Sequence, residues 1–155
     1  MELKEIAEGL SAKFQVEGLA VDDDELALEI DGIPILLSED KGVAVIITGF
    51  VGTPPVEGCE VFANMLLEST MSLMDTKSSA FARNPETGAY ALVQRVAQDG
   101  LSIDTFCEEL TNFVNQLESW RKVLEDFRPA AAAAKASADA QPGTEELARN
   151  GFMQV

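Results

Sequence analysis

An apolar stripe in the last third of the chain constrains the fold more than any other feature. Its residues recur at three- and four-residue steps, which predicts one long amphipathic helix. The stripe consists of Ile103, Phe106, Cys107, Leu110, Phe113, Val114, Leu117, Trp120, Leu124 and Phe127. Ser102 can cap the start of this helix, and Pro129 ends it. Acidic residues in its first turns and basic residues near its end both suit the helix dipole.

The first third of the chain changes from a helical pattern to an alternating one. Residues 3–14 have the apolar spacing of an amphipathic helix, and residues 26–30 alternate as in a half-buried strand. Asp31-Gly32 is a strong hairpin signal, so we expect residues 33–37 to return as a second strand. Residues 43–51 predict a third strand, whose continuous apolar character indicates cover on both faces.

The middle of the chain adds one helix and two short strands. The helix is predicted from about residue 57 to residue 74, after Pro54-Pro55. The strands are predicted at residues 78–83 and 89–96, on either side of a Gly- and Pro-containing turn. The predicted fold is therefore α+β in the order α-β-β-β-α-β-β-α, with a twisted antiparallel sheet packed against helices.

Composition divides the chain into one domain and a C-terminal extension. The chain has 155 residues, of which 46% are hydrophobic, enough for one core. We place the domain at residues 1–128, which carry all the predicted elements. Residues 129–144 predict an Ala-rich linker, and residues 145–155 a C-terminal tail that is a candidate docking segment.

The residues needed for most catalytic and metal chemistry are missing. The sequence has no histidine, the commonest general base near neutral pH and the commonest metal ligand. Cys59 and Cys107 lie at apolar positions of predicted helices, so we expect buried thiols and no zinc site. The acidic residues 22–25 do not begin an EF-hand, because Leu26 and Ala27 stand where a polar ligand and glycine are needed. We therefore expect no enzyme, no cofactor and no metal.

The charge balance limits the partners of the chain. A formal net charge of -16 repels phosphate backbones and anionic membranes, so we expect no nucleic acid and no membrane. Residues 1–5 do not begin a signal peptide, and residues 43–51 are far short of the roughly 20 residues of a membrane helix. A cytoplasmic protein is expected. The acidity either favours a basic or mixed-charge partner or only keeps the protein soluble.

The helix at residues 57–74 is apolar over most of its circumference. A surface helix usually keeps one face polar, so this helix predicts burial on two sides. A second copy of the chain, in a two-fold homodimer, would cover the second side, and the alternative is cover by the C-terminal helix or the tail. The predicted dimer-interface residues are Phe62, Met65, Leu66, Met71 and Leu73.

A second apolar surface is predicted between the first helix and the second strand. Extended peptides bind such places by adding a strand to a sheet edge and filling pockets. The alternative is that these residues are simply core. The candidate peptide-binding residues are Leu3, Ile6, Leu10, Phe14, Ile33, Ile35 and Leu37.

Over residues 1–128 the chain resembles the class I type III secretion chaperones, the CesT/Tir-chaperone family. The resemblance rests on the element order, the acidic composition and the small size. It also rests on the strand at residues 26–31, the segment Asn-Pro-Glu-Thr-Gly at residues 84–88 and the helix sequence Phe-Val-Asn-Gln-Leu-Glu-Ser-Trp-Arg at residues 113–121.

The resemblance implies a homodimer that binds the N-terminal segment of a secreted effector and keeps it secretion-competent. It implies that the helix at residues 57–74 forms the dimer and that the first helix and residues 33–37 bind the effector. The export ATPase is a further candidate partner. One rival hypothesis is an immunity-type or adaptor protein that binds a basic protein partner. Another is an enzyme that uses carboxylates alone.

Overall fold

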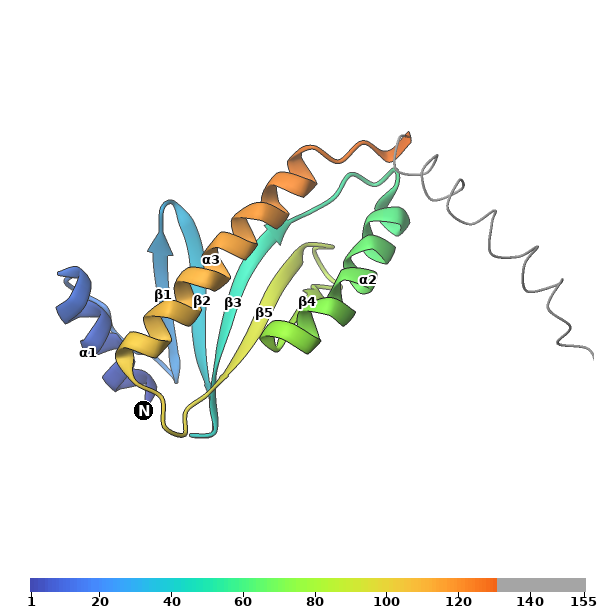
Figure 1. Ribbon diagram of the computed structural model, residues 1–155. Helices are drawn as coiled ribbons and strands as arrows, with labels where there is room; N and C mark the ends of the chain where they lie inside the picture. The colour runs from blue at the N-terminus through green and yellow to red at the C-terminus, as the bar shows by residue number, and fades with distance from the viewer. Residues whose placement is uncertain (131–155) are drawn as a thin grey trace, which may run out of the picture.

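The computed structural model describes residues 1–130, apart from the side chains of Thr76 and Lys77, and has the predicted α+β architecture (Figure 1). Its elements are α1 (Leu3–Phe14), β1 (Glu25–Ile30), β2 (Ile33–Asp40), β3 (Ala44–Gly52), α2 (Cys59–Lys77), β4 (Ser79–Arg83), β5 (Tyr90–Ala97) and α3 (Ile103–Glu125). The predicted element order is confirmed. Of the predicted linker and tail, everything from residue 131 onward lies outside the described residues.

The five strands form one antiparallel sheet in the order β1-β2-β3-β5-β4. The predicted hairpin joins β1 to β2, with Ile30 paired with Ile33. Asp31 and Gly32 have φ angles of 51° and 77°, the left-handed conformation that a two-residue hairpin turn needs. This topology leaves β1 and β4 as the two edge strands.

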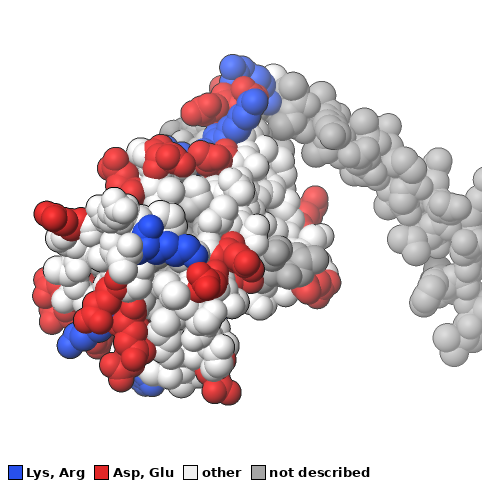
Figure 2. Space-filling model, turned by 60° about the vertical axis from the view of Figure 1, so that its left-hand side comes forward, with Lys and Arg blue, Asp and Glu red and all other residues white. Residues whose placement is uncertain are grey.

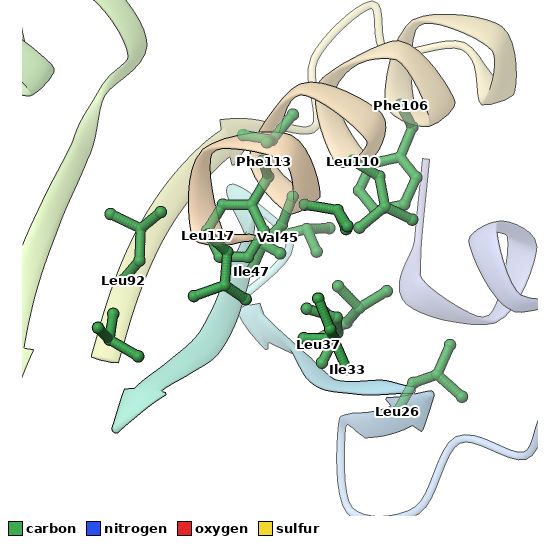
Figure 3. Close-up of a cluster of buried hydrophobic side chains, with 14 of the residues drawn as sticks. Leu26, Ile33, Leu37, Val45, Ile47, Leu92, Phe106, Leu110, Phe113 and Leu117 are labelled. Atoms are coloured by element: carbon green, nitrogen blue, oxygen red, sulfur yellow. The ribbon is translucent and has the colours of Figure 1, made fainter. Parts of the chain in front are cut away.

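One face of the sheet carries the hydrophobic core. Helix α3 lies across this face (Figure 1), and its Phe113 and Leu117 point toward Val45 and Ile47 of β3 (Figure 3). The approach is close, because a Cβ atom added to Gly49 would overlap the Leu117 side chain. Glycine at this position therefore lets the middle of α3 rest directly on β3.

Helix α2 packs on the same face as α3, beside β4. Its Phe62 ring contacts the rings of Tyr90 in β5 and Phe127 after α3, with centroids 5.7 and 5.1 Å apart. In the sheet, Tyr90 alternates onto the same side as Leu92, which faces α3. The Thr70 hydroxyl accepts a hydrogen bond from the Phe81 backbone N–H, which ties α2 to β4.

The opposite face of the sheet has no helix over it within residues 1–130. The prediction that β3 is covered on both faces is therefore wrong for the part of the chain that the structure describes. Ile46 and Thr48 of β3 are half-buried on this face, and the Phe50 side chain is exposed. Alternation sends these residues away from the helices, because Val45 and Ile47 face α3.

Helix α1 is held at both ends. At its start, the Leu3 backbone N–H donates to Glu39 Oε2 at 3.2 Å, and Gln98 Nε2 donates to Glu39 Oε1 at 3.2 Å. At its end, Lys13 Nζ lies 2.6 Å from Asp104 Oδ1 at the start of α3. The hydrogen bond from Lys13 lowers the pKa of the Asp104 carboxyl and raises that of Lys13. These contacts set α1 along the β1 edge of the sheet.

Candidate binding groove beside the edge strand

An apolar groove with a volume of about 450 Å³ lies between α1, β1 and α3. It exists because β1 is the last strand on this side of the sheet and α1 stands beside it. Its apolar walls include Leu10 and Phe14 of α1, Leu28 and Ile30 of β1, and Leu110 and Val114 of α3. The groove thus has one wall from each of three elements.

The mouth of the groove exposes large apolar side chains. Phe14, the last residue of α1, is 57% exposed, and Val16 just after it is 45% exposed. Gln15 between them has a φ of 55°, so the helix ends sharply and the chain turns away. The apolar surface therefore continues from inside the groove to its rim.

The backbone of β1 offers free hydrogen-bonding groups next to this groove. In a two-residue hairpin the residues that flank the turn are hydrogen-bonded to each other, so Ile30 and Leu28 bond to β2. Ala27 and Glu29 then point their N–H and C=O groups outward. Within residues 1–130 these outward groups form no hydrogen bond. An unpaired edge of this kind is a template for another strand.

The free part of the edge is short. The backbone N–H of Glu25 donates to the Asp22 carbonyl at 2.8 Å, and the Asp22 N–H donates to the Glu25 carbonyl at 2.9 Å. This pairing closes the edge at one end, and the turn at Asp31 closes it at the other. Only Ala27 and Glu29 remain for an incoming chain.

The charges around the groove are predominantly acidic. Glu29 and Asp31 of the β1 hairpin are among its lining residues, although strand alternation turns the Glu29 side chain to the face of β1 opposite Leu28 and Ile30. On the side of the molecule that carries α1 and β1, acidic side chains predominate around a largely uncharged area, with a few basic side chains among them (Figure 2). Cys107 also lines the groove, and burial raises the pKa of its thiol. An apolar floor with carboxylates at its border fits a segment that is both apolar and basic.

The structure places most of the predicted peptide-binding residues in the core. Six of the seven have little or no exposed surface: Leu3, Ile6, Leu10, Ile33, Ile35 and Leu37. Of the seven, only Leu10 and Phe14 line the groove. The apolar face of α1 packs directly on the sheet. The pocket between the start of α1 and the end of β2 is lined mostly by charged residues, among them Lys4 and Glu39, so it is not the predicted apolar groove.

The sequence interpretation missed the β1 and α3 walls of the groove. Leu28 and Ile30 were available as the apolar positions of the alternating strand, and Leu110 and Val114 as members of the α3 stripe. Their pattern is the same as that of core residues. These residues line a groove because β1 is an edge strand, with no further strand beside it, and the position of β1 in the sheet is not visible in the hydrophobic pattern.

The predicted dimer-interface residues of α2 separate into two groups. Phe62 and Leu66 are buried within the protomer, so they have no surface to offer a second copy. Met65 and Leu73 are half-buried, and Met71 is 76% exposed. Leu67 and Met74 of the same helix are also exposed, at 64% and 56%. We call the three exposed residues, Leu67, Met71 and Met74, the α2 outer stripe.

The two cysteines also differ from each other. Cys107 is buried, as predicted, but Cys59 is exposed, and the prediction of two buried thiols is wrong for it. Cys59 is the first residue of α2, at the end of the helix farthest from the β4 contact of Thr70.

The described part of the chain also bears on metal binding and membrane insertion. Among residues 1–130, no group of three or more Cys, Asp or Glu side chains is arranged to hold a metal ion. None of the helices described is both long and apolar enough to cross a membrane.

These features define a class: a small α+β domain with an open sheet edge beside an apolar groove. The model of the Tir chaperone protein (CesT) family matches residues 5–121. The chain therefore belongs to this family, as the resemblance predicted. No curated protein matches the chain in sequence.

Solved structures with the same fold include several that were determined as complexes of two proteins. The chain resembles a chain of the ExsC–ExsE complex with 18% identity and a TM-score of 0.68, over 80% of this chain and 97% of that one. It resembles a chain of the HopA1–SchA chaperone–effector complex with 19% identity and a TM-score of 0.65, over 77% of this chain and 92% of that one. For ExoU–SpcU from the type III secretion system of Pseudomonas aeruginosa the identity is 14% and the TM-score 0.60, over 79% of this chain and 99% of that one.

Proposed function

We propose that this protein is a type III secretion chaperone that binds the N-terminal segment of a secreted effector and keeps it secretion-competent. The observation that carries the proposal is the free β1 edge beside an apolar groove, in a chain of the Tir chaperone family. A structure with the same fold has been solved as a chaperone–effector complex. The chaperone acts by binding, without catalysis or cofactor, in the cytoplasm.

The groove supports a specific mode of binding. An extended segment that pairs with Ala27 and Glu29 satisfies the outward backbone groups of β1 and adds a sixth strand to the sheet. Its alternate side chains then stand beside Leu28 and Ile30 and enter the apolar groove. Backbone hydrogen bonds supply affinity that does not depend on the sequence of the segment, and the groove supplies selectivity.

The α2 outer stripe supports a homodimer. Leu67, Met71 and Met74 follow one another at helical spacing and expose three large apolar side chains. A second copy of the chain would bury them in a two-fold contact of α2 with α2. The interface proposed here is the outer stripe, flanked by half-buried Met65 and Leu73, and the export ATPase is a candidate partner of the assembled chaperone.

The rival hypothesis is an immunity-type or adaptor protein that binds a basic protein. Membership of the Tir chaperone family does not favour it. The two hypotheses predict different gene neighbourhoods, with secretion genes beside a chaperone and a toxin gene beside an immunity protein.

Purification of the full chain from its native host tests the proposed function. We expect one secreted protein to co-purify through its N-terminal segment, identified by mass spectrometry of the complex after limited proteolysis. We also expect that protein to be lost from the secreted fraction after deletion of the chaperone gene. Recovery of free chaperone only, together with unchanged secretion after deletion, would contradict the proposal.

A further inference from the structure

The side of β1 that faces away from the groove carries uncompensated negative charge. Glu25 and Glu29 alternate onto this side, whereas Leu28 and Ile30 face the groove. Their cross-strand neighbours on β2 are Ser38 and Pro34, and neither is a cation. Within residues 1–130 neither glutamate takes part in an ion pair.

An added strand would bring one residue directly beside Glu29. Neighbouring strands place their side chains on the same face at paired positions, whichever direction the added strand runs. The guest residue paired with Glu29 therefore shares its face, and the guest residues on either side of it face the groove. The guest residue paired with Glu29 therefore lies beside a carboxylate, and the guest residues before and after it lie against the apolar walls of the groove.

The free edge also limits the length of the guest strand. Because Asp22 already occupies the outward backbone groups of Glu25, pairing is confined to Ala27 and Glu29. Two outward-pointing residues in an edge strand accept a guest strand of about five residues. Asp31 in the turn adds a second carboxylate at the end of that strand, next to the groove.

Resting on the proposed function, we propose that the groove selects a segment of about five residues with the pattern apolar–basic–apolar. The two apolar side chains enter the groove beside Leu28 and Ile30, and the Lys or Arg between them pairs with Glu29. The overall charge of -16 attracts such a segment from a distance, and Glu29 sets its register. The acidity of the chain is then part of partner selection as well as of solubility.

Three designed peptides test this selection against the full chain. They have the sequences Ser-Thr-Ile-Lys-Ile-Thr-Ser, Ser-Thr-Ile-Thr-Ile-Thr-Ser and Ser-Thr-Ile-Glu-Ile-Thr-Ser, with blocked ends. Titration followed by the amide signals of Ala27 and Glu29 in NMR spectra reports binding at the edge even when the affinity is weak. We expect the lysine peptide to bind more tightly than the threonine peptide by roughly two- to fivefold, and the glutamate peptide to bind least.

Two chaperone variants show whether Glu29 is the cause. In Glu29→Gln the preference for lysine over threonine should disappear. Glu25→Gln is the matched control, because Asp22 keeps a guest strand away from Glu25, and the preference should persist there. High salt should reduce the preference in the unmodified chain as screening increases.

The outcomes separate this inference from the proposed function. Equal binding of the three peptides, absence of shifts at Ala27 and Glu29 for all three, or a preference that survives in Glu29→Gln would each overturn the inference. Effector co-purification from the native host would be unaffected by any of these results. If instead no secreted protein co-purified with the chain from the native host, the proposed function would be overturned.

Discussion

Phe62 and Met71 lie on the same helix and have opposite surroundings. The Phe62 side chain is fully buried against the rings of Tyr90 and Phe127, whereas Met71 is 76% exposed. Removal of a buried aromatic ring leaves a cavity and loses its packing contacts. Burial therefore assigns Phe62 to the core and leaves Met71 for contacts with another molecule.

We predict that Phe62→Ala lowers the free energy of unfolding by about 3–5 kcal/mol, and that Met71→Ala changes it by less than about 0.5 kcal/mol. Urea unfolding at low protein concentration, where a dimer would contribute little, measures both. Comparable losses in the two variants would mean that Met71 is also packed within the protomer.

The ion pair of Lys13 with Asp104 has a pH dependence that follows from its geometry. The hydrogen bond from Lys13 lowers the pKa of the Asp104 carboxyl from its ordinary value of 3.8. A carboxyl with a lowered pKa in the folded state stabilises that state above its unfolded pKa, and this contribution is lost as the pH falls through the folded value. The pair is exposed to solvent, so its effect on stability is small.

We predict that Lys13→Met returns the pKa of Asp104 to its ordinary value, whereas Lys4→Met does not. Both residues are exposed lysines of α1, but only Lys13 reaches Asp104. An NMR titration of the Asp104 carboxyl carbon measures the effect. An unchanged Asp104 pKa in Lys13→Met would show that the contact does not persist in solution.

At the scale of the elements, the proposed homodimer depends on the α2 outer stripe. A charge placed in an apolar interface has no partner and is costly to bury. We predict that Leu67→Glu or Met71→Glu gives folded monomers, as measured by light scattering together with circular dichroism. Asn112→Glu is the control, because it adds the same charge to an exposed position of α3. Dimers that persist in both α2 variants would place the interface elsewhere.

Most elements could be predicted from periodicity, and so could the buried face of α3, but the buried face of α2 could not. The α3 stripe is narrow, so its buried face follows from the spacing, and Phe106, Leu110 and Phe113 are buried as expected. Helix α2 is apolar over most of its circumference, so the sequence does not distinguish Leu66, which is buried, from Leu67, which is exposed. That distinction depends on the position of β4.

The candidate groove was predicted one strand away from its actual place. Because β2 pairs with both β1 and β3, β2 is an inner strand and β1 is the edge, so Ile35 and Leu37 of β2 are core residues and the groove opens beside β1. Hydrophobic alternation is the same in both strands, Leu28 in one and Ile35 in the other. Only the order of the strands in the sheet tells that Leu28 lines the groove and that Ile35 belongs to the core.

At the scale of the whole molecule, the domain has its helices on one face of the sheet and its free backbone edge at β1. The edge is next to the groove and the acidic side chains, so shape, hydrogen bonding and charge favour a guest at the same place. The α2 outer stripe lies on the helix beside β4, the strand at the other edge of the sheet. One protomer can thus bind a second copy and a guest segment through different elements.

Residue-level hydrogen exchange on the full chain, free and bound to its co-purified effector, tests the central claim most directly. The amides of Ala27 and Glu29 are unpaired in the free protein, so we predict that they become strongly protected in the complex. The Glu25 amide is the internal control, because its hydrogen bond to Asp22 exists before binding. Protection that left Ala27 and Glu29 unchanged and appeared only on the open face of the sheet or at β4 would contradict this account.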